Sequence, residues 1–187
     1  MKDEDSFLLD DPARLKALAH PMRRLMLRHL SLHGSATSTT LADLLGAKTG
    51  TTSYHLRQLE KYGFVEEVPG HSAGRERWWR RTEGPRDMRL PTPDMLAPED
   101  RPVLMEFHRI GLEEDLALFQ RLPEIYEREP RWVKASRGIA RMTAQEFEEF
   151  FEAYMKVLKK HSPRAEDASP DARPMFVRLF AFPAEDG

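Results

Sequence analysis

Apolar residues recur at helical spacing along the first part of the chain. A short stripe begins after Asp11-Pro12, a pair that can cap and start a helix. A second stripe covers residues 22–30 at positions i, i+3, i+4, i+7 and i+8, which predicts another helix. Residues 35–40 are small and polar and predict a loop, in which Ser38 or Thr39 would cap the following helix.

Residues 41–63 predict two helices joined by a tight turn, with the second helix ending at Gly63. Thr52, Leu56 and Leu59 lie four and three residues apart, as the core face of that helix requires. Its other faces carry hydrogen-bonding side chains, namely Thr51, Tyr54, Arg57, Gln58 and Lys61. This layout is that of a helix-turn-helix whose second helix is free to enter a DNA major groove.

Two short segments after this stretch have strand composition, residues 64–68 and 76–82, with a turn-rich tip between them. Together they predict a β-hairpin, or wing. The return strand carries Trp78 and Trp79 among arginines. Because alternate residues of a strand face opposite sides, we expect one tryptophan to pack on the helices.

A helix is predicted over residues 99–122, with apolar residues on more than one stripe. Such a helix must bury two sides, one on its own module and one on a partner subunit. The predicted dimerisation residues are Leu104, Phe107, Ile110, Leu112, Leu116 and Phe119.

Thr143 to Glu146 form a capping box that begins a helix over residues 144–160 with a wide apolar face. Residues 131–140 and 175–182 are predicted to be strands that pair beneath this helix. The aromatic side chains either form the core of this module or enclose an apolar effector. The candidate effector pocket comprises Trp132, Phe147, Phe151, Tyr154, Phe176 and Phe180.

The predicted fold class is mainly α with a small β component. Residues 1–11 form an acidic tail, and residues 12–83 form a winged helix-turn-helix domain. Prolines make residues 84–98 a linker. Residues 99–187 form an α+β C-terminal module for dimerisation, with the candidate effector site.

Charge divides along the chain. Residues 12–90 contain 14 Lys and Arg against 7 Asp and Glu, a net charge of +7, whereas residues 91–187 have 14 against 19, or −5. A basic module joined to an acidic one favours nucleic-acid binding by the first. There is no cysteine, hence no thiolate metal site.

The acidic N-terminus lacks a signal-peptide pattern, and no apolar run approaches the roughly 18 residues that span a bilayer. We therefore expect a cytoplasmic protein without membrane contact. Acidic clusters such as 113–115 have no nucleophile, phosphate loop or metal set around them, so no catalysis and no cofactor are expected.

Five segments in order resemble the ArsR-type winged helix-turn-helix repressors, over about residues 12–83. They are residues 16–24 (KALAHPMRR), 41–46 (LADLLG), 53–59 (SYHLRQL), 63–65 (GFV) and 74–77 (GRER). The resemblance implies a DNA-binding transcription regulator that works as a homodimer on a two-fold-symmetric operator.

Metal sensing is not expected of this chain. The thiolate sites of that family need cysteines, and none is present. A second kind of family site needs paired carboxylate and histidine ligands on the last helix. Here Glu106-x-His108 lacks a second histidine at a suitable spacing to complete it.

We expect Arg57 to bind a guanine edge and Gln58 an adenine edge. His55 either contacts DNA or braces the helix from its side. The full set of predicted DNA contacts is Lys48, Thr49, Gly50, Thr51, Ser53, Tyr54, His55, Arg57, Gln58, Lys61, Arg75 and Arg77.

The predicted function is that of a sequence-specific regulator, a homodimeric repressor on a pseudo-palindromic operator. The alternatives are a winged-helix protein-interaction module and a non-thiolate ligand or metal sensor of the same fold.

Overall fold

A computed structural model describes residues 6–9, 11–69, 76–82, 87–161 and 169–184, with the backbone alone for residues 6–8 and 87–89. The elements of the first half are β1 (Ser6–Leu8), α1 (Pro12–Leu18), α2 (Pro21–His33), β2 (Ala36–Thr37), α3 (Ser38–Leu45), α4 (Thr49–Lys61), β3 (Val65–Glu67) and β4 (Trp78–Arg81). They are followed by β5 (Asp87–Arg89), η1 (Pro93–Met95), α5 (Arg101–Gln120), α6 (Leu122–Arg128), η2 (Pro130–Trp132) and α7 (Ala144–Lys160).

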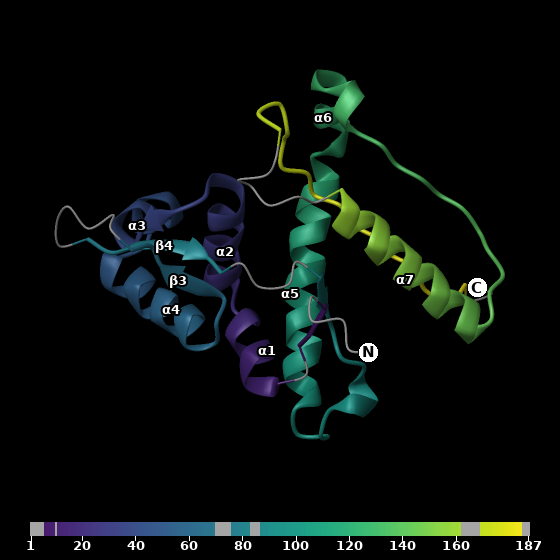
Figure 1. The fold of residues 1–187 in the computed structure, drawn as a ribbon, viewed down its shortest axis with the longest axis horizontal. Helices are drawn as coiled ribbons and strands as arrows, with labels where there is room; N and C mark the ends of the chain where they lie inside the picture. Colours follow the sequence, from purple (N-terminus) through teal and green to yellow (C-terminus); the bar gives the residue numbers. More distant parts are fainter. Residues whose placement is uncertain (1–5, 10, 70–75, 83–86, 162–168, 185–187) are drawn as a thin grey trace.

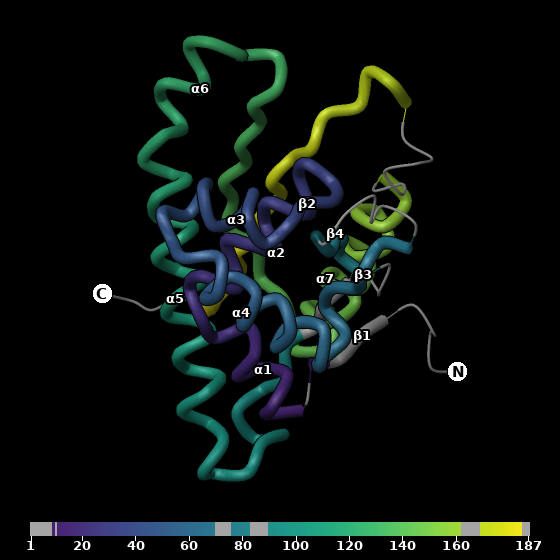
Figure 2. The backbone as a smooth tube through the Cα atoms, turned by 90° about the vertical axis from the view of Figure 1, so that its left-hand side faces the viewer, coloured from purple at the N-terminus to yellow at the C-terminus, as the bar shows by residue number. Residues whose placement is uncertain are grey.

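Helix α5 runs through the middle of the molecule (Figure 1). Helices α1 to α4 and the small sheet lie on one side of it, and α7 lies on the other. Turning the molecule by 90° shows α6 continuing beyond the end of α5 (Figure 2). None of the described helices is long and apolar enough to cross a membrane.

The predicted start of α1 and the predicted ends of α2 and α4 are confirmed. Asp11 caps α1 by accepting a hydrogen bond from the Ala13 N–H at 2.8 Å. Gly34 follows α2 with a φ of 84°, and Gly63 follows α4 with a φ of 74°. Both values lie in the region that favours glycine, so these two residues end their helices where other residues would be strained.

One core joins α1 to α4 with α5. Leu15, Met26, Leu41 and Leu56 are fully buried in it, one from each of the first four helices. Leu104 of α5 is buried in the same cluster. Helix α5 therefore completes the core of the helix-turn-helix.

Three of the six predicted dimerisation residues belong to this core. Leu104, Phe107 and Ile110 are buried within the single chain, so they are covered without a second subunit. The Arg24 guanidinium lies over the Phe107 ring at 4.8 Å and binds both carboxylate oxygens of Glu114. These contacts hold α2 against that face of α5.

The small sheet has the strand order β2-β4-β3, and both pairings are antiparallel. Trp79 pairs with Ala36 on one side and with Glu67 on the other. It is buried, so it is the tryptophan that packs on the helices, whereas Trp78 is half-buried. The sheet confirms the predicted wing and the mainly helical fold class with a small β component.

The predicted loop over residues 35–40 contains strand β2 and begins α3. Thr37 caps that helix by accepting a hydrogen bond from the Thr40 N–H at 3.1 Å, so the prediction of Ser38 or Thr39 is wrong. Strand β2 pairs with β4 and ends at Thr37, so the Thr37 hydroxyl lies at the start of the helix.

The predicted tail and linker also take part in the fold. Strand β1 pairs with β5 in parallel, which brings residues 6–8 beside residues 87–89. Leu9 and Leu96 are both buried in the core. These two leucines therefore extend the core beyond residues 12–83.

The C-terminal part is helical and extended. Helix α7 and its capping box at Thr143 and Glu146 are confirmed. The predicted strands at 131–140 and 175–182 are wrong, because neither segment forms a strand. A strand needs a neighbour for its N–H and C=O groups, and the described residues of this region supply none.

Candidate DNA-binding surface

A left-handed glycine joins α3 to α4. Gly46 has a φ of 60° and a ψ of 34°, and its N–H binds the Ala42 carbonyl oxygen. The Ala47 N–H binds the same oxygen at 2.9 Å. This closes α3 and turns the chain so that α4 can start at Thr49.

Thr52 fixes how the two helices cross. Its side chain is fully buried, and Oγ1 lies 2.8 Å from the Ser38 carbonyl oxygen and 3.0 Å from the Thr49 carbonyl oxygen. A buried hydroxyl without a partner would be costly, so this bond favours one orientation of α4 against the start of α3.

His55 lies on the inner side of α4, next to His20. Its ring is buried and lies 4.5 Å from the His20 ring, measured between centroids. Burial is the main cause that lowers the pKa of both histidines, and Arg23 lowers both further. The Nδ1 atoms of both rings are buried without a hydrogen-bond partner. Of the two roles expected for His55, its burial favours bracing of the helix.

The remaining predicted residues of α4 face outward to different degrees. Lys48 at the N-cap is exposed. Six residues of the helix are exposed as well: Thr49, Gly50, Thr51, Tyr54, Arg57 and Lys61. Ser53 and Gln58 are half-buried. The outer surface of α4 thus carries hydroxyl, amide and basic groups without a large apolar patch.

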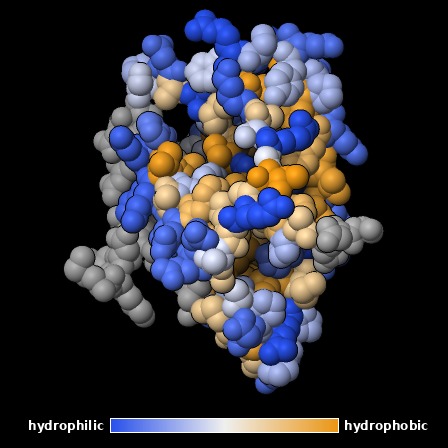
Figure 3. Space-filling model, turned by 90° about the vertical axis from the view of Figure 1, so that its right-hand side faces the viewer, coloured by the Kyte–Doolittle hydropathy of each residue, from blue (hydrophilic) through white to orange (hydrophobic). Residues whose placement is uncertain are grey.

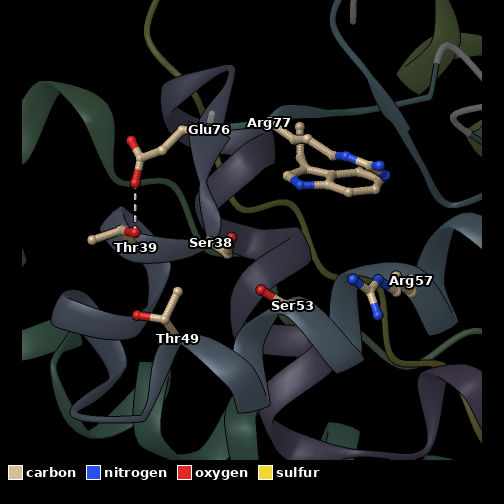
Figure 4. A pocket seen from close by; sticks show the side chains of 8 residues that line it. Ser38, Thr39, Thr49, Ser53, Arg57, Glu76 and Arg77 are labelled. Atoms are coloured by element: carbon tan, nitrogen blue, oxygen red, sulfur yellow. Dashed lines mark hydrogen bonds between the residues drawn. The ribbon is translucent and has the colours of Figure 1, made fainter. Parts of the chain in front are cut away.

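A hollow of about 270 Å³ lies between α4, the start of α3 and the wing. It is lined by Ser38, Thr39, Thr49, Ser53, Arg57, Glu76, Arg77 and Trp79. Figure 4 shows Arg57 and Arg77 on one side of it and the Thr39–Glu76 pair on the other. The structure therefore brings together Thr49, Ser53, Arg57 and Arg77 of the predicted site.

Four residues of this hollow were absent from the predicted site, namely Ser38, Thr39, Glu76 and Trp79. The Thr39 hydroxyl donates a hydrogen bond to the Glu76 carboxylate at 2.7 Å. This bond connects the first turn of α3 to the residue that leads into β4. The sequence Gly-Arg-Glu-Arg at 74–77 includes Glu76, but a DNA contact was predicted only for its two arginines.

Ion pairs anchor the described part of the wing. Arg80 binds Glu66 across the sheet at 2.7 Å, and Arg77 lies 3.7 Å from Glu67. The side chain of Arg77 is 61% exposed, so it can still reach a partner beside the wing. Arg75 lies outside the described residues.

The structure does not gather the candidate effector residues into one enclosed site. Trp132, Phe147, Phe176 and Phe180 are all exposed by 41% or more. Phe180 contacts Phe119 of α5 at a centroid distance of 5.8 Å, and Arg28 of α2 lies over the Phe176 ring. Phe151 and Tyr154 are half-buried on α7.

Glu106, the carboxylate considered for a metal, binds the Arg109 guanidinium instead. Within the described ranges, no group of three or more His, Cys, Asp or Glu side chains is placed to hold a metal ion.

A protein-family model described as a helix-turn-helix domain matches residues 18–68. This range extends from the end of α1 to just beyond β3 and contains all of α3 and α4. No curated protein matches the chain.

Several solved structures are similar to parts of this chain. A fragment of a "possible transcriptional regulatory protein" from Mycobacterium bovis is 26% identical, with coverage of 55% of this chain and 89% of that one and a TM-score of 0.34. ZitR from Lactococcus lactis is 16% identical, with 76% and 83% covered and a TM-score of 0.36. MarR from E. coli is 18% identical, with 78% and 76% covered and a TM-score of 0.29.

Scores at this level do not establish a common arrangement of whole chains. The assignment rests on the match over residues 18–68, together with the turn, the second helix and the wing described above. This match also agrees with the expectation of a regulator rather than an enzyme. Residues 18–68 therefore carry a helix-turn-helix domain of the ArsR type, and strands β3 and β4 give this domain the form of a winged helix-turn-helix.

Proposed function

We propose that the protein is a homodimeric repressor that binds a pseudo-palindromic operator through α4 and the basic wing. The row formed by Thr49, Ser53 and Arg57 on the outer face of α4 carries this proposal, since it ends beside Arg77 of the wing. Residues four apart lie on one side of a helix, so all three can face one groove of DNA. A repressor must reach the chromosome, and we place it in the cytoplasm for that reason.

The side chains of α4 divide into two kinds of contact. Arg57 can bind a guanine edge with two hydrogen bonds, and Gln58 can do the same for adenine. Lys48 and Thr49 lie at the start of α4, where free N–H groups and the helix dipole favour a phosphate. Arg77 is assigned to the DNA backbone beside the wing.

A dimer requires a second interface away from α4. The remaining predicted dimerisation residues, Leu112, Leu116 and Phe119, follow one side of α5 and are 55%, 51% and 42% exposed. A two-fold dimer would present its two α4 helices to half-sites about 34 Å apart, or a multiple of that spacing. The operator is expected to have matching symmetry.

The test measures binding to the DNA upstream of the protein's own gene by fluorescence anisotropy at several salt concentrations. Arg57→Ala is expected to cost roughly 1–3 kcal/mol and to relax the preference for this DNA over unrelated sequence. Arg77→Ala should weaken all sequences alike and flatten the salt dependence.

Arg109→Ala serves as the matched control. Arg109 is an exposed arginine of α5 whose guanidinium binds Glu106 and Glu113, away from α4. Its removal changes the net charge by the same amount as the other two variants. If Arg57→Ala binds DNA as well as Arg109→Ala at low salt, the assignment of α4 to the major groove is wrong.

A further inference from the structure

Among the described residues that line the hollow beside α4, Glu76 is the acidic one. The other charged side chains of the hollow are those of Arg57 and Arg77. Glu76 is exposed and directly precedes Arg77 in the sequence. A carboxylate beside the DNA backbone repels phosphates, so it weakens binding to every DNA sequence. Repulsion alone would therefore make Glu76 unfavourable at this place.

The Thr39–Glu76 hydrogen bond continues the pairing of two strands. Strands β2 and β4 are antiparallel, with Thr37 opposite Trp78. Two residues further along each segment, the same register places residue 39 opposite residue 76. Strand β2 ends at Thr37, because the chain enters α3 at the next residue. The Thr39 hydroxyl donates to the Glu76 carboxylate at 2.7 Å (Figure 4), so a side-chain bond connects the two segments where the backbone pairing has ended.

This bond lies at the N-terminal end of β4, and other bonds lie at its C-terminal end. There the Arg81 guanidinium donates to the Ser31 hydroxyl of α2 at 2.8 Å. The Thr82 hydroxyl donates to the Gly63 carbonyl oxygen, also at 2.8 Å. These two bonds hold one end of the return strand on the helix-turn-helix. Glu76 holds the other end, and it does so at the first turn of α3.

The position of Arg77 depends on the same bond, since Arg77 follows Glu76 directly. Arg77 lies 3.7 Å from Glu67 of β3, a contact that joins two parts of the wing. The Thr39–Glu76 bond instead joins the wing to α3. A wing that is held in place before binding loses less conformational freedom when Arg77 and α4 contact DNA together.

We propose that Glu76 is a positioning residue for DNA recognition. By binding Thr39, it holds the wing against α3, so that Arg77 reaches the DNA backbone while α4 lies in the major groove. The benefit acts on the DNA that α4 selects, whereas the repulsion acts on all DNA. The inference rests on the proposed function and adds Thr39 and Glu76 to the residues that determine selectivity.

Substitution of Glu76 distinguishes positioning from repulsion, because the two effects have opposite signs. Glu76→Ala removes both the charge and the bond. Repulsion alone predicts tighter binding to the upstream DNA and to unrelated DNA alike. Positioning predicts that selectivity, the ratio of the two dissociation constants, falls about 3- to 10-fold. Fluorescence anisotropy with both DNAs measures this ratio.

Substitution of Thr39 separates the bond from the charge. Valine is β-branched like threonine but has no hydroxyl. Thr39→Val should lower selectivity as much as Glu76→Ala does and should flatten the salt dependence as Arg77→Ala does. Thr39→Ser and Glu76→Gln keep the donor and the acceptor, so each should retain the selectivity. Thr39→Val combined with Glu76→Ala should lower it no further than either change alone.

Glu148→Ala is the matched control for the change in charge. Glu148 is an exposed residue of α7, and α7 lies on the other side of α5 from the wing (Figure 1). The face of the molecule on which α7 lies displays hydrophobic residues among its charged ones (Figure 3). Removal of Glu148 changes the net charge as Glu76→Ala does, and it should leave the selectivity at the wild-type value.

Hydrogen exchange of the free protein tests the same contact without DNA. Thr39→Val should speed amide exchange over residues 76–79 by about 3-fold or more, whereas Glu148→Ala should not change it. Unchanged exchange in Thr39→Val would overturn the proposal. A selectivity of Glu76→Ala that equals or exceeds that of the wild type would overturn it as well.

Failure of this inference and failure of the proposed function give different results. A selective wild-type protein whose Thr39→Val and Glu76→Ala variants are equally selective keeps the repressor and loses the inference. A wild-type protein without preference for the upstream DNA loses the repressor, and with it the role of Glu76 in recognition. In that case, faster exchange in Thr39→Val would still show that the bond holds the wing.

Discussion

Two regions of this chain differ in whether their apolar side chains are buried. Between Leu9 and Ile110, leucine, methionine, phenylalanine and tryptophan side chains close around one core. From residue 121 onward, none of the described residues is buried, although phenylalanine is frequent there. Both regions contain amphipathic helices with well-formed caps. The difference lies in whether the chain itself supplies the surface that covers them.

This contrast limits what an apolar pattern can establish. The spacing of Leu56 and Leu59 and that of Phe147 and Phe150 both predict a helix with one apolar face. The first pair is fully buried in the core, whereas Phe147 and Phe150 are each 41% exposed. A pattern therefore predicts that a face will be covered, but does not identify the molecule that covers it.

The largest difference between the regions is expected in a pair of alanine substitutions. Leu56→Ala removes a fully buried side chain and should lower the free energy of unfolding by roughly 2–5 kcal/mol. Ile139→Ala removes a side chain that is 92% exposed and should change it by less than about 0.5 kcal/mol. Urea unfolding followed by circular dichroism measures both. Similar losses of unfolding free energy in the two variants would contradict the difference in burial between the two regions.

A smaller difference is expected between two equivalent helix caps. Thr37 caps α3 and Thr143 caps α7, each through a hydrogen bond from the N–H three residues later. Thr37→Ala should lower the unfolding midpoint by an amount worth about 1 kcal/mol. Thr143→Ala should leave that midpoint in place in dilute protein and reduce only the helical signal, since α7 adds little to the core.

Hydrogen exchange at the first turns of α3 and α7 provides the independent readout of the two caps. A Thr143→Ala variant that shifts the main transition as far as Thr37→Ala would mean that α7 unfolds together with the helix-turn-helix.

The smallest effect is expected from pH. Burial lowers the pKa of His20 and His55 below the ordinary value of 6.5, so the unfolded chain takes up protons at a higher pH than the folded one. Stability is therefore complete above that value and falls as the pH drops below it.

His55→Gln should flatten this pH dependence when urea midpoints at about pH 8 and about pH 5.5 are compared. His161→Gln, a change at an exposed residue, is the control and should retain the wild-type slope. A loss of stability on acidification that is equal in both variants would assign the effect to other groups.

The helices of residues 11–63 could be predicted because the residues that mark their ends and faces are close together in the sequence. Asp11-Pro12, Gly34 and Gly63 each mark a helix end through their own backbone chemistry. The core face of α4 follows from the spacing of Thr52, Leu56 and Leu59. His55 was ambiguous, since only the packing of α1 and α2 determines that it meets His20.

Other features depend on contacts between distant residues, which local patterns do not contain. The pairing of β1 with β5 joins positions about eighty residues apart, and the hydrogen bond from Thr39 to Glu76 joins α3 to the wing. The strands predicted at 131–140 and 175–182 had suitable composition. Composition does not show whether a neighbouring strand is available, and none is found among the described residues.

The burial of Leu9 against the same core as Leu104 sets an order of events during synthesis. The core of the DNA-binding part contains Leu9 at its beginning and Leu104 of α5 at its end. Helices α1 to α4 therefore leave the ribosome before the surface that covers them exists. This core cannot form until about the hundredth residue has emerged. Its formation then brings together two ends of the chain that are separated by almost all of the residues made so far. A nascent chain arrested before α5 is expected to remain sensitive to proteases, whereas one arrested well after α5 is expected to resist them.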